Sequence, residues 1–148
     1  MFQELLDNQV FIAALISWFT GQFLKVPINY LFTRKLNWGL WFSSGGMPST
    51  HSSLMVTATL STGLNYGFNS ASFAVAFAIT MIVVYDASGV RRQAGIHAQK
   101  INQIFEEFLH GRPIEIDKLK VVMGHTPAQV VGGIILGILV SLVTWWIW

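Results

Sequence analysis

A turn rich in glycine and hydroxyl side chains, residues 45–52, leads directly into an apolar segment. Ser49 or Thr50 can cap the helix that this segment predicts, and the first turn of a helix presents N–H groups with partial positive charge. A phosphate gains hydrogen bonds and dipole stabilisation at such a place, and His51 would stand beside it. The turn therefore predicts either a phosphate site next to a histidine or an ordinary capped helix with His51 at its start.

The same arrangement recurs before the last apolar segment, at residues 124–129. Thr126 has the properties of an N-cap, Pro127 those of a first helical residue and Gln129 those of the capping-box partner. Capping explains these three residues without any catalysis, so we assign Gln129 a structural role. Capping does not explain His125, which is therefore a candidate for chemistry.

An acid and two guanidinium groups follow another apolar segment, within residues 85–92. Arginine binds phosphate oxygens in a planar fork, so Arg91 and Arg92 are candidates for phosphate binding. They can equally be anchors that pair with lipid headgroups. Asp86 needs a partner because a carboxylate at a membrane boundary is costly, and the partner is either a histidine that it orients or Arg91.

The composition indicates which elements must position these side chains. Of the 148 residues, 53% are hydrophobic and 11% are charged, whereas soluble domains are about 25% charged. Apolar segments at residues 10–24, 51–66, 70–85 and 130–148 predict four membrane helices. We therefore expect an all-α membrane bundle that forms a single domain over residues 1–148. Cysteine is absent, which excludes disulfides, thiolate metal sites and cysteine nucleophiles.

The basic residues predict the topology. All 9 Lys and Arg lie between residues 25 and 35 or between residues 91 and 120, in the connections after the first and third predicted helices. With four spans these connections share one side, which the positive-inside rule identifies as the cytoplasm. Both termini are then expected outside. This topology brings residues that are distant in sequence to one cytoplasmic membrane face: Lys25, His51, Asp86, Arg91 and His125.

The second basic connection contains a helix of its own. Ile101, Ile104, Phe105, Phe108 and Leu109 recur with helical spacing on one face. The following basic residue, glycine and proline, within residues 110–113, are typical of a helix end. We expect this amphipathic helix to lie at the membrane surface, packed under the bundle.

These motifs resemble those of the phosphatidic acid phosphatase type 2 superfamily, and in particular its small divergent branch related to acid phosphatases and vanadium-dependent haloperoxidases. Residues 48–51 match the superfamily's proline-serine-glycine-histidine motif, except that Thr50 replaces the glycine. The divergent branch is more similar still. Its tyrosine-aspartate-alanine, glycine-valine-arginine-arginine and glycine-histidine-threonine-proline segments match residues 85–87, 89–92 and 124–127. The resemblance covers nearly the whole chain.

Two motifs of the superfamily are incomplete in this chain. In the first motif six residues separate a lysine from an arginine, whereas eight separate Lys25 from Arg34. The third motif contains an arginine and a histidine with the spacing of Arg91 and His97, but its serine and aspartate are replaced. We therefore prefer His125 as the counterpart of the superfamily's nucleophile and keep His97 in reserve.

The resemblance implies a phosphomonoesterase that forms a phosphohistidine and needs neither a metal nor another cofactor. His125 would attack phosphorus, Asp86 would orient it, and His51 would protonate the departing alkoxide and then activate water. The phosphate would be bound by charged and hydroxyl residues, which are Lys25, Arg34, Ser49, Thr50 and Arg91.

A site at the headgroup level of a bilayer suits a lipid with a terminal phosphate. On the cytoplasmic face we rank phosphatidylglycerophosphate first and phosphatidic acid next, with isoprenoid phosphates as an alternative. The competing functions are a non-enzymatic membrane scaffold or lipid-binding subunit, and a transporter. The expected partners are the lipid substrate and the bilayer, not nucleic acid. Gly133 and Gly137 offer a small-residue helix contact, either within the chain or in a homo-oligomer.

Overall fold

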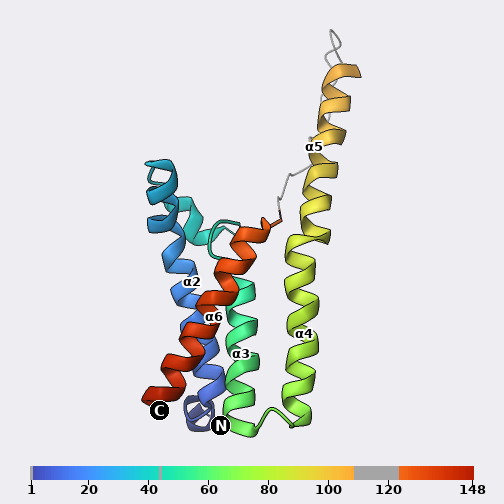
Figure 1. The fold of residues 1–148 in the computed structure, drawn as a ribbon. Coiled ribbons are helices and arrows are strands. Elements are labelled where there is room, and N and C mark those ends of the chain that lie inside the picture. The colour runs from blue at the N-terminus through green and yellow to red at the C-terminus, as the bar shows by residue number, and fades with distance from the viewer. Residues whose placement is uncertain (1, 44, 109–123) are drawn as a thin grey trace.

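The computed structural model describes residues 2–43, 45–108 and 124–148 (Figure 1). These residues form six α-helices and one 3₁₀ helix, and no strand occurs within the described ranges. The predicted all-α fold class is therefore confirmed. In chain order the elements are α1 (Phe2–Leu6), α2 (Gln9–Thr33), η1 (Trp38–Phe42), α3 (Thr50–Tyr66), α4 (Ala71–Ser88), α5 (Val90–Phe108) and α6 (Pro127–Ile147).

Within the described residues, three helices are long and apolar enough to cross a membrane. They are α2, the helical stretch that runs from α4 into α5, and α6. The second predicted span forms α3, which has 17 residues and is not among the three. The count of four spans therefore stays a prediction, although each predicted segment does form a helix.

α3 lies at the centre of the bundle and packs against α2, α4 and α6 (Figure 1). It is rich in Ser and Thr, and most of these hydroxyl groups are buried against the neighbouring helices. Thr59 Oγ1 lies 2.7 Å from Thr80 Oγ1 of α4, and Ser61 Oγ lies 2.9 Å from Ser141 Oγ of α6. Hydroxyl pairs of this kind hold helices together where the surroundings offer no water to bond.

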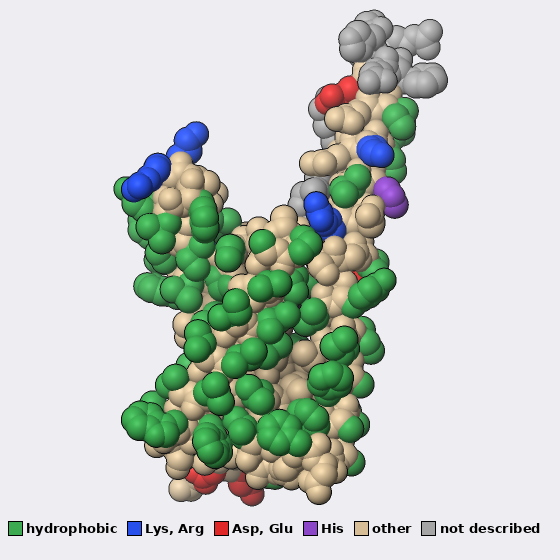
Figure 2. Space-filling view, in the orientation of Figure 1, with side chains coloured by type: hydrophobic (Ala, Val, Ile, Leu, Met, Phe, Trp, Pro, Cys, Tyr) green, Lys and Arg blue, Asp and Glu red, His purple; other side chains and the backbone are tan. Residues whose placement is uncertain are grey.

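The side chains on the outer surface of the bundle are mainly apolar, whereas those in its interior are mainly small and polar. Figure 2 shows hydrophobic side chains over the visible side of the bundle, and large residues such as Phe19, Ile82 and Leu139 are more than half exposed. The buried side chains are mainly Ser and Thr. A soluble domain shows the opposite distribution, so this surface fits contact with lipid.

Two glycines of α6 allow its close approach to α3. A Cβ added at Gly133 would lie 2.4 Å from the carbonyl oxygen of Ser49, and one added at Gly137 would lie 2.7 Å from that of Ser53. Thr57 Oγ1 donates to the Gly137 carbonyl at 3.0 Å. The small-residue contact therefore packs helices within the chain. Association of copies stays a prediction.

α2 continues well beyond its predicted end at residue 24, so Lys25 lies inside a helix. The prediction that Lys25 belongs to the first connection was wrong. Pro27 has no N–H, and the carbonyl of Phe23 therefore loses its usual helical donor. The indole Nε1 of Trp41 donates to this carbonyl at 3.3 Å, and the Phe23 and Trp41 rings stack with their centroids 5.8 Å apart. The docking of η1 thus compensates for a proline within α2.

α5 carries Ile101, Ile104 and Phe105 of the predicted apolar stripe but differs in extent and position. Only Gly89 separates it from α4, and it continues in much the same direction, away from the bundle (Figure 1). Of the described helices it contacts only α4. The expectation that this helix packs under the bundle is wrong, because the chain does not turn back after α4. The predicted helix end, residues 110–113, lies outside the described residues, as does Leu109 of the stripe.

The two ends of the bundle differ in charge. α1, the connection between α3 and α4 and the end of α6 lie at one end (Figure 1). The visible Lys and Arg side chains gather toward the other end, where α2 stops and α5 starts (Figure 2). This arrangement agrees with the predicted grouping of the basic residues, while the side that faces the cytoplasm stays a prediction.

Candidate functional site

The first turn of α6 is anchored on the end of α4. Thr126 is the N-cap of α6, and its side chain and that of Gln129 form the predicted capping box. One residue earlier, the N–H of His125 donates to the carbonyl of Ala87 at 3.0 Å. His125 is only 6% exposed. The motif that contains His125 is therefore fixed to the segment that contains Asp86.

Gln129 has a second contact that the sequence analysis missed. Its Oε1 atom lies 3.1 Å from Nδ1 of His125 and also accepts the N–H of Thr126 at 3.1 Å. The signal was present in the capping box, because a side chain that reaches back to the N-cap also comes close to the residue before it. Gln129 therefore serves both the helix start and the surroundings of His125.

The start of α3 is joined to the same turn of α6. The N–H of Ser49 donates to the carbonyl of Gln129 at 3.0 Å. The Ser49 side chain caps α3, and Thr50 lies against Gly21 of α2, where an added Cβ would come within 3.0 Å of Thr50 Cγ2. Both side chains are buried and serve the local structure. His51 is exposed at the same helix start.

Lys25 lies against the loop that leads to α3. Its side chain is fully buried, and Nζ donates to the carbonyl of Ser43 at 2.7 Å. The same carbonyl lies 3.4 Å from Nε2 of Gln22. Gly46 has a φ of 93°, and a Cβ added there would lie 3.6 Å from Cδ of Lys25. The ammonium group therefore holds the loop and adds a positive charge beside it.

Asp86 and Arg91 come from the junction of α4 and α5. Asp86 is half-buried in the last turn of α4, next to the Ala87 carbonyl that binds the N–H of His125. Arg91 lies in the first turn of α5, just beyond Gly89. The backbone thus holds the acidic segment against His125, and the arginine segment begins a few residues later in the chain.

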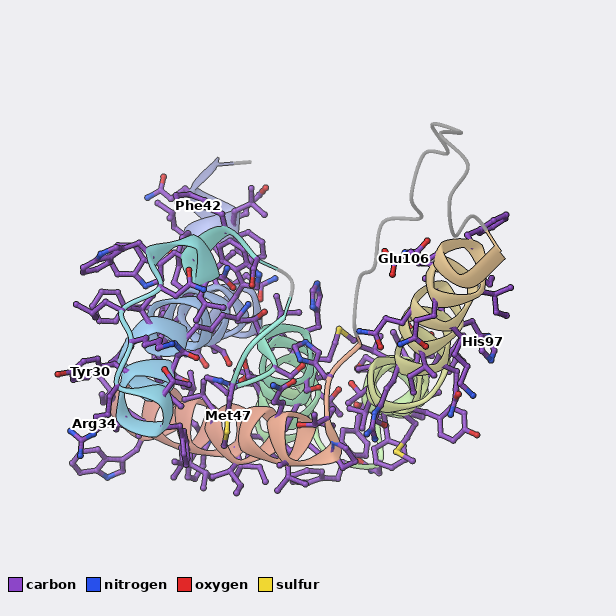
Figure 3. The ribbon with its side chains drawn as sticks, turned by 90° about the horizontal axis from the view of Figure 1, so that it is seen from above. Tyr30, Arg34, Phe42, Met47, His97 and Glu106 are labelled. Carbon is purple, nitrogen blue, oxygen red and sulfur yellow. The ribbon has the colours of Figure 1, made fainter. Side chains whose placement is uncertain are left out.

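The joined segments form a cluster at one end of the bundle and carry Lys25, His51, Asp86, Arg91 and His125. Two predicted residues lie away from this cluster. Arg34 is the exposed C-cap of α2, and its side chain points outward from the bundle in Figure 3. His97 of α5 also points away from the bundle (Figure 3). It lines a cavity of about 590 Å³ whose described walls come only from α4, Gly89 and α5. The structure therefore does not bring Arg34 or His97 to His125.

A cavity of about 360 Å³ opens between α2 and α6 beside Gln129. Its lining combines the apolar side chains of Ile28, Phe32 and Met47 with the polar ones of Thr126 and Gln129. Met47 lies between the two helices in Figure 3. A lining of this mixed character suits the region of an amphiphilic molecule where its apolar and polar parts meet.

A family model described as the Divergent PAP2 family matches residues 6–140. The chain belongs to this family. The matched range contains every candidate residue from Lys25 to His125, so the predicted resemblance is confirmed. The chain is also 37% identical over 151 residues to the "Uncharacterized membrane protein YuiD" of Bacillus subtilis (strain 168), an alignment that covers 95% of this chain and 96% of the relative. No solved structure matches the chain.

Membership of the Divergent PAP2 family suggests a phosphatase-related role. The membrane relative and the apolar helices identify the chain as a membrane protein. In the described part of the chain, no group of three or more His, Cys, Asp and Glu side chains could hold a metal ion. The groups that the cluster itself offers are two histidines, a carboxylate and a buried ammonium group, from His51, His125, Asp86 and Lys25.

Proposed function

We propose that the protein is a membrane lipid phosphatase that hydrolyses a terminal phosphomonoester through a phosphohistidine at His125. The observation that supports this best is the fixed position of His125, whose backbone is bound to Ala87 and whose ring contacts Gln129. A nucleophile that attacks phosphorus in line needs a defined orientation, and a buried histidine with contacts to both its backbone and its ring provides one.

The proposed reaction has two phosphoryl transfers. In the first, a ring nitrogen of His125 gives its electron pair to phosphorus while the bond from phosphorus to the lipid oxygen breaks, and His51 protonates the departing oxygen. In the second, His51 removes a proton from water and the water oxygen attacks phosphorus. The phosphorus–nitrogen bond breaks and returns its electron pair to His125. The products are a lipid alcohol and inorganic phosphate.

The remaining residues of the cluster balance charge in this scheme. The ammonium group of Lys25, the backbone N–H groups at the start of α3 and the guanidinium group of Arg91 stabilise the phosphate oxygens. Asp86 stabilises the positive charge that develops on His125 during the first transfer. Arg34 has no role here, because its side chain points outward (Figure 3).

The proposed substrate is an amphiphilic lipid. The cluster lies at one end of an apolar bundle, so acyl chains can stay in the bilayer while the headgroup reacts. The cavity beside Gln129 supports this proposal because its lining is part apolar and part polar. We rank phosphatidylglycerophosphate first and phosphatidic acid second, since both carry a phosphomonoester at the cytoplasmic face, and isoprenoid phosphates third.

The decisive experiment is phosphate release by the purified protein in detergent, with EDTA present, from each of these three lipid classes. We expect release by the unmodified protein and none by His125→Ala. Release that depends on an added divalent ion would replace the proposal with metal-assisted hydrolysis. No release from any lipid phosphate would contradict it.

We further propose that the site faces the cytoplasm and that both termini lie outside. The chain has no cysteine, so single cysteines can be placed at Asn69, between α3 and α4, and at Lys100 on α5. An impermeant maleimide applied to intact cells is expected to label position 69 but not position 100. The reverse pattern would contradict the orientation and favour isoprenoid phosphates, the substrates of many superfamily members whose sites face outward.

A non-enzymatic membrane scaffold or lipid-binding subunit is the second candidate. The burial of Lys25, Ser49 and Thr50 favours it, because their hydrogen bonds and packing contacts serve the fold. In that case the contacts of His125 are only structural, and the loss of its buried ring and of the contact with Gln129 changes the stability of the protein without any phosphatase activity to lose. The phosphate-release experiment separates the two candidates.

A further inference from the structure

We propose that Gln129 is a positioning residue, which holds His125 in the tautomer with the proton on Nδ1 and thereby makes Nε2 the nitrogen that attacks phosphorus. This inference rests on the proposed function for its chemical consequence. The first part of the inference, that Gln129 sets the tautomer of His125, can be measured without any turnover.

The backbone identifies which end of the Gln129 amide faces His125. The N–H of Thr126 lies 3.1 Å from the side-chain atom Oε1 of Gln129. A backbone N–H can only donate, so the atom that it meets must be the amide oxygen and not the NH₂ group. The orientation of this side chain therefore follows from the capping box.

The same oxygen determines the protonation of the imidazole ring. Oε1 of Gln129 lies 3.1 Å from Nδ1 of His125, and an amide oxygen has no proton to give. A hydrogen bond exists between these atoms only if Nδ1 carries the proton. In the neutral ring the lone pair is then on Nε2, which is the nucleophilic nitrogen.

Main-chain contacts fix the backbone of both residues in this arrangement. The N–H of His125 is bonded to the carbonyl of Ala87, and the carbonyl of Gln129 accepts the N–H of Ser49 at the same turn. The two residues that form the side-chain hydrogen bond thus have their main chains held by contacts with α4 and with the start of α3. Little ordering remains to be done when a substrate arrives.

A neutral amide suits both transfers of the proposed reaction. When Nε2 bonds to phosphorus, the proton stays on Nδ1 and the ring becomes positively charged. The amide oxygen of Gln129 accepts the hydrogen bond but cannot remove the proton, because a protonated amide is a far stronger acid than an imidazolium. The phosphohistidine therefore keeps a good leaving group, since breakage of the phosphorus–nitrogen bond returns a neutral imidazole.

Three variants separate positioning from capping. Gln129→Met has a side chain of similar length without the acceptor oxygen. Gln129→Glu keeps an acceptor for both Nδ1 of His125 and the N–H of Thr126. Thr126→Ala is the matched control, because it removes the cap hydroxyl that accepts the N–H of Gln129 but leaves the backbone N–H that orients the Gln129 amide.

The tautomer is read by nitrogen NMR of ¹⁵N-histidine-labelled protein in detergent, with His125→Gln used to assign the signals. We expect His125 to be protonated on Nδ1 in the unmodified protein, in Gln129→Glu and in Thr126→Ala, and to populate both tautomers in Gln129→Met. Protonation on Nε2 in the unmodified protein overturns the inference, as does an unchanged tautomer in Gln129→Met. A population of both tautomers in Thr126→Ala also overturns it, because the cap and not the Gln129 amide would then determine which ring nitrogen is protonated.

Turnover tests the chemical consequence. The loss of one hydrogen bond to a reacting group predicts that Gln129→Met lowers kcat by about 10- to 100-fold with little change in KM, and that Gln129→Glu restores most of it. The phosphohistidine should be linked through Nε2. Activity of the unmodified protein with unchanged kcat in Gln129→Met refutes the positioning role alone. Absence of activity in the unmodified protein refutes the proposed function, while the NMR result still decides whether Gln129 sets the tautomer.

Discussion

The starts of α3 and α6 use the same local sequence pattern in opposite ways. Each has a hydroxyl N-cap, Ser49 or Thr126, and each carries a histidine within two residues of that cap. At α3 the histidine follows the cap and His51 is exposed. At α6 it precedes the cap, and His125 is buried and bound to Ala87.

The difference shows that a capping motif alone does not decide what its histidine can do. A residue before the cap is directed back against the preceding structure, whereas an early helical residue projects from the helix surface. The proposed roles follow this division. His125 attacks from a fixed position, while His51 exchanges protons with a leaving group and then with water, which requires access.

The largest expected effect is the contrast between His125→Ala and His51→Ala. His125→Ala should abolish turnover of every substrate. His51→Ala should slow hydrolysis of a lipid phosphate by about 10²- to 10⁴-fold, the usual contribution of a general acid. An aryl phosphate has a better leaving group, so His51→Ala should recover part of its rate there. The measurement is initial phosphate release from both substrates.

Equal losses on the lipid and aryl substrates in His51→Ala would remove its role as the acid. Full activity of both variants on both substrates would mean that the two helix starts do not differ in function, and that their histidines are structural.

A second expected effect compares Lys25 with Arg34, the two basic residues of α2. Lys25→Met removes the bond from Nζ to the Ser43 carbonyl and a charge beside the loop before α3. In the proposed reaction the ammonium group also bonds a phosphate oxygen, and hydrogen bonds of charged groups contribute about 1.5–3 kcal/mol, so kcat/KM should fall by about 10- to 100-fold. Arg34→Met alters an exposed side chain that points outward (Figure 3) and should stay within about twofold. Equal effects of the two substitutions would mean that the phosphate does not bind beside Lys25.

The elements of the bundle were largely predictable from the sequence because hydropathy and capping are local properties. The starts of α3 and α6 follow from Ser49 and Thr126, and the turn between α3 and α4 follows from the shift to polar residues and glycine. The full length of α2 was not predictable from local rules. A lysine followed by a proline is typical of a helix end, and the compensating bond from Trp41 to Phe23 comes from a distant part of the chain.

The site was predictable as a set of segments but not as a set of contacts. Topology correctly brought the segments of His51, Asp86 and His125 to one end of the bundle. It did not distinguish Arg34 from Lys25, because the extension of α2 buries one and exposes the other. The amphipathic stripe of α5 was recognised, but periodicity along a helix does not say in which direction that helix leaves the bundle.

A smaller expected effect tests the packing that brings the two helix starts together. A Cβ at Gly133 would lie 2.4 Å from the backbone oxygen of Ser49, whereas the nearest atom to one at Gly132 would be the flexible end of Met47, at 3.0 Å. Gly133→Ala should therefore destabilise the protein by about 1–3 kcal/mol, a typical cost of overpacking, and lower activity with it. Gly132→Ala is the matched control and should change the thermal midpoint in detergent much less. Equal midpoints would show that α6 does not rest on Ser49 as described.

The central claim is that His125, and not His97, carries the phosphoryl group. The most direct test is a brief incubation with a lipid phosphate radiolabelled in its terminal phosphate, followed by an alkaline quench, which preserves phosphohistidine. We predict covalent label on the unmodified protein and on His97→Ala, and no label on His125→Ala. Label that persists in His125→Ala and disappears in His97→Ala would contradict the account, because the nucleophile would then lie on α5, away from the start of α6.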